Sequence, residues 1–313
     1  DEVIVKGIRA KFSSPISFTN VDKQDLKSKN LGQDLPILLN FLPSVVTTSD
    51  AGAGIGYTGI RIRGVSPQST NITINGIPFN DPESMGTFWV NLPDFSSSIE
   101  SLQVQRGVGT STNGSGAFGA SINILTDIVS DQPYAELSSS FGSYNTLKNT
   151  IKFSTGKIND YFELSGRLSK IDSDGYVDRA YSDLKSYFIQ GAYTNGSTLI
   201  KAISFGGHEK TYQAWYGLSV DQVEENRRQN PYTYENEIDN YKQDHFQLHW
   251  NEKINNYWSF NLGLNYTDGR GYFEQYKEDD DINTYVGIVK SDIDSNGNET
   301  GTTDLIRRRW LDN

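Results

Sequence analysis

A two-residue alternation over residues 258–267 constrains the fold of this chain more than any other feature of its sequence. Every second side chain is apolar and the positions between are polar or glycine; the apolar set is Trp258, Phe260, Leu262, Leu264 and Tyr266. Successive side chains of a β-strand point to opposite faces, so this segment predicts a strand with one apolar and one polar face. Aromatic residues bound the apolar face at both ends, which is typical of a strand that crosses a bilayer around a wet interior.

The same alternation recurs upstream of this strand. It is clear at 162–169 and 245–250 and weaker at 134–141, 146–154, 184–194 and 198–207. An eighth strand is expected to start near Thr303.

The connections between these strands tend to alternate in length. Short connections are expected at 156–160, 195–197 and 252–256, and long ones at 172–183, 211–240 and 269–302, with the first connection, 142–145, as an exception. Strands of about ten residues with short turns on one side and long loops on the other predict an antiparallel membrane β-barrel.

Composition alone leaves a soluble fold open. The chain is 35% hydrophobic with a mean hydropathy of −0.55, and no apolar run approaches the about 20 residues that a membrane helix needs. A soluble β-sandwich with exposed outer faces would share this composition. Sandwich strands are usually about five or six residues long, and loops beyond about 15 residues are uncommon in compact domains, so the sandwich is the less favoured alternative.

Residues 61–126 have a different, turn-rich pattern. Two strand-like stretches end in Arg-Gly, at Arg63 and Arg106, and Asn75-Gly76 between them is a hairpin signal. An apolar run follows at 120–125, and a loose stripe of leucines predicts a helix over 22–40 that Pro36 could divide in two. These elements predict a small mixed domain.

This stretch closely resembles the plug domain of TonB-dependent outer-membrane transporters, and the resemblance extends over nearly the whole chain. It implies a β-rich fold: a lead at 1–15, a small mixed α/β plug domain at 16–130, and antiparallel transmembrane β-barrel strands at 131–313. Barrels of this family have about 22 strands. Because unpaired strand edges are not tolerated in hydrocarbon, seven or eight strands cannot close, and the chain is expected to be an N-terminal portion.

The resemblance also implies a function. It points to TonB-dependent active import of a scarce nutrient, with a ferric siderophore or similar chelate favoured by the segment Thr73-Ile-Asn-Gly-Ile-Pro. The alternatives are a glycan or peptide importer that works with a lid lipoprotein, a surface receptor or adhesin without transport, and a passive pore. The implied partners are TonB with its inner-membrane proton-driven complex, outer-membrane lipids and a small nutrient. The implied location is the cell outer membrane, with the N-terminus of the plug facing the periplasm.

Three sets of residues follow from the resemblance. A TonB-coupling segment, able to add as a strand to its partner, comprises Asp1, Glu2, Val3, Ile4 and Val5. Plug arginines that would meet barrel-wall glutamates are Arg63 and Arg106, with Glu100 sharing their network. Substrate contacts are expected from the apical loops, at Tyr57, Gln68, Asn80, Asp81, Glu83, Met85, Phe88 and Trp89.

Other functional classes are disfavoured. The net charge of −11 and pI of about 4.8 argue against a nucleic-acid partner, and the absence of cysteine removes thiolate metal sites. The G-x-G-x-x-G match at 114–119 precedes a strand rather than opening a helix, so no nucleotide cofactor is expected. Asp292 and Asp294 begin a calcium-loop pattern that has Thr303 where the bidentate glutamate belongs. His245 and His249 would lie about 13 Å apart along a strand. No catalytic constellation, enzyme activity, cofactor or metal site is therefore expected.

Overall fold

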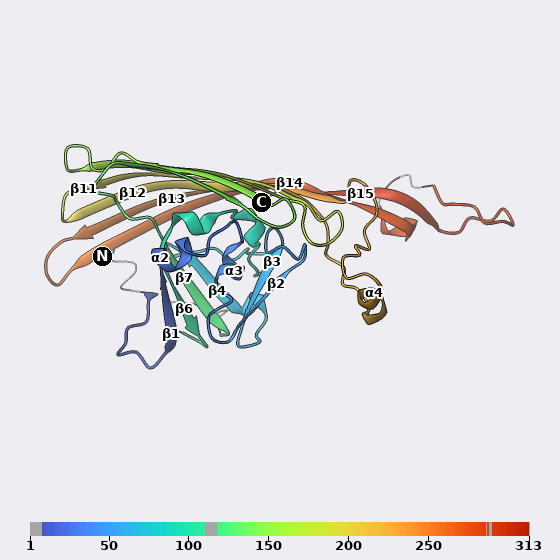
Figure 1. Cartoon of the computed structure of the whole chain (residues 1–313), viewed down its shortest axis with the longest axis horizontal. Coiled ribbons are helices and arrows are strands. Elements are labelled where there is room, and N and C mark those ends of the chain that lie inside the picture. The colour runs from blue at the N-terminus through green and yellow to red at the C-terminus, as the bar shows by residue number, and fades with distance from the viewer. Residues whose placement is uncertain (1–7, 110–117, 286, 288–289, 313) are drawn as a thin grey trace.

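The computed structural model describes residues 8–109, 118–285, 287 and 290–312, which form an N-terminal domain and one large curved sheet. The domain lies against the concave face of the sheet, and the strands of the sheet extend well past it on both sides (Figure 1). This arrangement places the loops of the domain next to the inner face of the strands.

The N-terminal domain is built on a mixed five-stranded sheet in the order β1-β6-β7-β4-β5. The strands are β1 (Ser17–Asp22), β4 (Thr70–Ile74), β5 (Ile77–Pro78), β6 (Ile99–Arg106) and β7 (Ala120–Thr126). Strands β4 and β7 are parallel and the other pairs are antiparallel. The predicted hairpin turn is present between β4 and β5: Asn75 and Gly76 both have positive φ, as the tight two-residue turn requires.

A second sheet and several short helices complete the domain. The sheet pairs β2 (Val45–Ser49) with β3 (Thr58–Ile62), and the helices are α2 (Lys23–Lys27), α3 (Leu35–Leu38), η1 (Pro67–Ser69), η2 (Trp89–Asn91) and η3 (Phe95–Ser98). The helix predicted over 22–40 is present only as α2 and α3. Pro36 lies in the first turn of α3, where its missing N–H costs nothing, so it starts the second piece rather than ending the first.

The large sheet has eight antiparallel strands that pair in chain order. They are β8 (Tyr134–Phe141), β9 (Leu147–Ser154), β10 (Phe162–Ser173), β11 (Ser182–Thr194), β12 (Thr198–Tyr212), β13 (Ile238–Lys253), β14 (Ser259–Asp281) and β15 (Thr302–Asp312). Every strand predicted from the alternation is present, and the later ones are longer than predicted. The loop between β12 and β13 carries a short helix, α4 (Val220–Glu225), and η5 (Ile282–Thr284) follows β14.

The two faces of the large sheet differ as the alternation predicts. On β13, the side chains of Phe246, Leu248 and Trp250 face outward and are more than 40% exposed. Their neighbours His245 and His249 are buried on the inner face, toward the N-terminal domain. Among the described residues, no helix is long and apolar enough to span a membrane.

A hydrophobic core joins the domain to the sheet. Isoleucines, leucines and valines of β4, β6 and β7 contribute to it together with leucines of residues 26–42, and Phe188, Ile203 and Phe205 contribute from β11 and β12. Phe95 of η3 contacts Phe205, with ring centroids 5.1 Å apart. The domain is therefore seated on the strands by apolar packing as well as by polar contacts.

Candidate functional site

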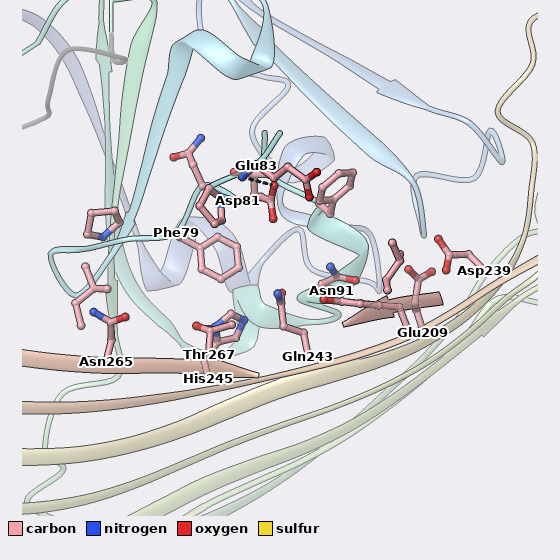
Figure 2. A pocket seen from close by; sticks show the side chains of 18 of the residues that line it. Phe79, Asp81, Glu83, Asn91, Glu209, Asp239, Gln243, His245, Asn265 and Thr267 are labelled. Atoms are coloured by element: carbon pink, nitrogen blue, oxygen red, sulfur yellow. Dashed lines mark hydrogen bonds between the residues drawn. The ribbon is translucent and has the colours of Figure 1, made fainter. Parts of the chain in front are cut away.

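A cavity of about 1060 Å³ lies between the N-terminal domain and the inner face of β12, β13 and β14. Figure 2 shows its two sides: Phe79, Asp81 and Glu83 come from the loop that follows β5, and the side chains of the strands face them. The labelled strand residues are Glu209, Asp239, Gln243, His245, Asn265 and Thr267.

Two side chains fold the loop that covers the cavity. Asn80 accepts from the Ile72 backbone N–H (2.7 Å) and donates to the carbonyl oxygens of Thr70 (2.9 Å) and Met85 (3.0 Å). The Asp81 carboxylate accepts from the backbone N–H groups of Glu83 (3.1 Å) and Ser84 (2.6 Å). Asn80 and Asp81 therefore shape the loop even where they line the cavity.

The structure brings five of the eight predicted substrate residues to this cavity. Those five are Tyr57, Asn80, Asp81, Glu83 and Phe88. Trp89 is buried in the hydrophobic core of the domain, Gln68 lies in η1, and Met85 is half exposed on the loop. Ligand contact by any of the eight stays a prediction.

Sequence reasoning missed the contribution of the strands. The Tyr57 hydroxyl donates to the Asp239 carboxylate and lies 3.5 Å from the Glu209 carboxylate; the two acids come from neighbouring strands of the sheet. Burial, and then the charges of Glu209 and Asp239, raise the pKa of Tyr57 well above its ordinary value, so the hydroxyl keeps its proton. Glu209 and Asp239 lie beyond the predicted strand ranges, and Asp239 falls in the connection expected at 211–240. Only the two-residue period continued past 207 and back from 245 would have placed both carboxylates on the inner face.

Aromatic rings pack beside Tyr57. Trp215 contacts Tyr57 edge-on with ring centroids 5.3 Å apart, and Phe273 contacts Trp215 at 5.8 Å. Elsewhere in the cavity Phe79 packs on His245 at 5.0 Å. The cavity thus offers aromatic faces and negative charge to whatever it binds.

Outside this cavity, a buried ion-pair cluster joins the domain to the sheet. The Asp94 carboxylate lies 2.7 Å from Lys148 Nζ of β9 and 3.4 Å from Arg167 Nη1 of β10. It also accepts from the hydroxyls of Thr150 (2.7 Å) and Ser169 (2.6 Å). Burial opposes ionisation of Asp94, but Arg167 and Lys148 outweigh it and hold the pKa well below the ordinary range.

A second cluster has the same polarity. Asp127, just after β7, lies 2.6 Å from Lys152 of β9 and 2.8 Å from Lys23 of α2, and Lys23 also pairs with Glu100 at 3.0 Å. Lys152 therefore joins the sheet to the domain, while the Glu100 pair is internal to the domain. In both clusters the carboxylate that crosses the interface belongs to the domain and its cation to the sheet, an arrangement that sequence reasoning did not identify.

The two predicted plug arginines differ in their surroundings. Arg106 is buried and donates to the carbonyl oxygen of Pro43 (3.0 Å) and the hydroxyl of Thr19 (2.7 Å), while Arg63 is exposed. Within the described part of the chain neither has a carboxylate partner. Burial and the charge of Arg63 lower the pKa of Arg106, so a carboxylate beside them would stabilise both cations. Their pairing with barrel-wall glutamates stays a prediction.

The TonB-coupling residues Asp1, Glu2, Val3, Ile4 and Val5 lie outside the described residues. Across the described ranges, no group of three or more His, Cys, Asp or Glu side chains could hold a metal ion.

Comparison with known proteins finds a family match for the N-terminal domain. Residues 10–121 match the TonB-dependent Receptor Plug Domain. The probable TonB-dependent siderophore receptor PirA of Acinetobacter baumannii is 28% identical over 127 residues, which cover 37% of this chain and 17% of that protein. The vitamin B12 transporter BtuB of Vibrio vulnificus is 29% identical over 160 residues, 51% of this chain and 25% of that protein. The chain thus spans about a quarter or less of the length of these relatives.

Solved structures share the fold at low sequence identity. The siderophore receptor PirA from Acinetobacter baumannii superposes with a TM-score of 0.64 at 16% identity, over 98% of this chain and 45% of that one. The ferric-catecholate import receptor Fiu from E. coli K12 has a TM-score of 0.67 at 17% identity, over 84% of this chain and 40% of that one. The predicted fold class, a plug followed by antiparallel strands, is confirmed.

Proposed function

We propose that the chain belongs to a receptor that actively imports a scarce nutrient across the outer membrane, since its residues 10–121 match the TonB-dependent receptor plug domain. A ferric chelate is the favoured cargo, because several similar proteins are named as receptors for siderophores or ferric enterobactin. The observation that carries the proposal is the domain itself, lodged against the inner face of strands whose outer face is apolar and exposed.

The proposed mechanism has three steps. The nutrient binds in the cavity between the plug loop and the strands. Residues 1–7, on the periplasmic side, then pair with TonB by strand addition, in which backbone hydrogen bonds supply the grip. Force from the inner-membrane proton-driven complex shifts the plug and opens a path along the sheet.

The interface clusters suit a plug that must be held and then moved. Lys148, Lys152 and Arg167 hold Asp94 and Asp127 through directional contacts, and these contacts lose most of their strength once the partners separate and water enters. A buried pair of this kind stabilises one geometry specifically, so a small displacement of the domain would release it.

A coupling variant tests the proposal. Val5→Pro should abolish energy-dependent uptake of ferric chelates and leave their binding nearly unchanged, because proline removes a backbone donor that strand addition needs. Val5→Ile, which keeps that donor, is the matched control and should transport normally. Growth on defined iron sources and uptake of radiolabelled iron are the measurements, and wild-type uptake by Val5→Pro would contradict the coupling assignment.

The same experiment separates the alternatives. A surface receptor or adhesin without transport would bind its ligand and accumulate none, with or without the proline. A glycan or peptide importer would transport, but growth on ferric chelates would not depend on the chain. In that case co-purification of a lid lipoprotein would identify the importer.

A further inference from the structure

One end of the cavity combines aromatic rings with carboxylates. The rings of Tyr57, Trp215 and Phe273 form a chain of edge contacts, and Glu209 and Asp239 both lie within reach of the Tyr57 hydroxyl. Figure 2 shows the carboxylates of Glu209 and Asp239 rising from the strands toward the loop that carries Asp81 and Glu83. Aromatic faces beside carboxylates are the surroundings in which proteins hold ammonium and guanidinium groups.

The charge of the cavity has one sign. Five carboxylates line it, and no lysine or arginine is found among its described lining residues; the acids are Asp50, Asp81, Glu83, Glu209 and Asp239. Two carboxylates that share one tyrosine hydroxyl repel each other, and a cation placed beside them would relieve that repulsion. A trianionic chelate would instead meet repulsion from both sides of the cavity.

Polar atoms without partners mark the same cavity. Asp239 Oδ1, Asn91 Oδ1 and His245 Nε2 have no hydrogen-bond partner among the described residues, although these residues are only 4%, 8% and 6% exposed. All three residues line the cavity. A buried polar atom left without a partner is costly, so these atoms are well placed to meet complementary groups of a ligand.

We propose that this end of the cavity binds an ammonium or guanidinium group, and that the cargo is therefore an amine-bearing, cationic ferric chelate rather than an anionic one. Asp239 Oδ1 and the Glu209 carboxylate accept from the cation, and the Trp215 and Tyr57 rings contact its other face. The inference rests on the proposed function and names the substrate class of the same site. It departs from the similar proteins that are named as receptors for ferric enterobactin.

Paired probes test the substrate class. Hydroxamate, catecholate and carboxylate ferric chelates are each prepared with a free primary amine and with that amine acetylated, and their binding to the full-length receptor in detergent is measured. The amine-bearing member of at least one pair should bind about 10-fold tighter or more, with the advantage shrinking as salt is added. Equal or tighter binding of the acetylated members, or no binding of any amine-bearing chelate, overturns the inference.

Variants assign the preference to these residues. Asp239→Asn and Glu209→Gln should each reduce the preference for the amine-bearing chelate and leave binding of its acetylated partner unchanged. Trp215→Leu should weaken binding of the amine-bearing chelate by about 2- to 30-fold, the range expected for loss of a cation–π contact. Asp160→Asn, which removes an exposed acid in the connection between β9 and β10, is the control and should change neither. An undiminished preference in both Asp239→Asn and Glu209→Gln overturns the assignment.

Uptake measurements keep this inference separate from the proposed function. Energy-dependent import of acetylated or anionic chelates, with the amine-bearing forms excluded, would uphold import and overturn the cation subsite. Tight, amine-dependent binding without any import would uphold the subsite and overturn the transport proposal.

Discussion

At the scale of single residues, Asp94 is the carboxylate through which the N-terminal domain meets two buried cations. Its neighbours Lys148 and Arg167 are 3% and 1% exposed, so neither can recover water if the carboxylate is lost. Asp94 has positive φ, in the left-handed region that Asp and Asn tolerate better than most residues. Both the charge and the backbone conformation therefore favour this residue type at the position.

Asp94→Asn should destabilise the seated domain by about 3–5 kcal/mol, because it leaves a buried charge cluster without its anion while keeping shape and backbone preference. Asp131→Asn is the control: Asp131 pairs with Lys157 at 2.7 Å but is largely exposed, so its loss should cost about 1 kcal/mol or less. Denaturant unfolding and protease sensitivity of the full-length receptor give the measurement. Equal costs for the two variants would mean that the buried cluster contributes little to seating.

The pH dependence of seating follows from the same carboxylates. The folded pKa values of Asp94 and Asp127 are depressed, so their contribution is fully present above the unfolded value of about 3.9 and is lost as pH falls toward the folded pKa values. We expect the free energy that holds the N-terminal domain on the sheet to be insensitive to pH near neutrality and to fall below about pH 4. The stability difference between wild type and Asp94→Asn should shrink over the same acid range; a difference that grows on acidification would contradict this sign.

At the scale of elements, β14 shows how the alternation assigns the two faces of a strand. Leu264 faces outward opposite Leu248 of β13, and Asn265 faces the cavity opposite Gln247. Leu264 lies six residues past the connection at 254–258, which is near the middle of a bilayer for a tilted strand of about 10 residues.

Leu264→Arg should destabilise the folded receptor by about 2–4 kcal/mol, because it places a guanidinium on the lipid-facing side at mid-depth. Asn265→Arg, one residue along on the wet side, should cost much less. Refolding titrations into lipid or detergent compare the two. Similar costs would mean that the strand is oriented otherwise or does not face lipid.

At the scale of the whole molecule, the large sheet is open within the described residues. Strands β8 and β15 are its two edges, and neither edge has a partner strand there. Backbone groups without partners cost several kcal/mol each in hydrocarbon, so a sheet that spans a membrane must close on itself. The N-terminal domain and its cavity would then sit inside the closed wall.

A polypeptide of residues 1–313 alone should therefore fail to refold in detergent as a heat-resistant monomer, whereas the same residues followed by further wall strands should succeed. Heat-modifiable migration in electrophoresis is the measurement. A heat-resistant monomer formed by residues 1–313 would overturn the membrane-wall interpretation of β8 to β15.

The sequence by itself determined the strands, their faces and the turn at Asn75-Gly76. Each of these depends on residues a few positions apart: the two-residue period of a strand fixes which side chains share a face, and the tight turn needs two positive-φ residues in a row. The resemblance over 61–126 predicted the plug domain and the barrel strands that follow it. The sequence also predicts that the helix over 22–40 divides into two pieces, but it does not predict that Pro36 lies in the first turn of the second piece.

Only the tertiary structure decided which charges meet. Asp94 reaches Lys148 and Arg167, and Tyr57 reaches Glu209 and Asp239, because the domain docks at one particular position along strands far away in the chain. The alternation says that a lysine or glutamate points inward, but it does not say which loop of the domain lies opposite. The docking position also depends on the shared apolar core, in which Phe95 packs on Phe205, and that core is a property of the two surfaces together and not of either segment alone.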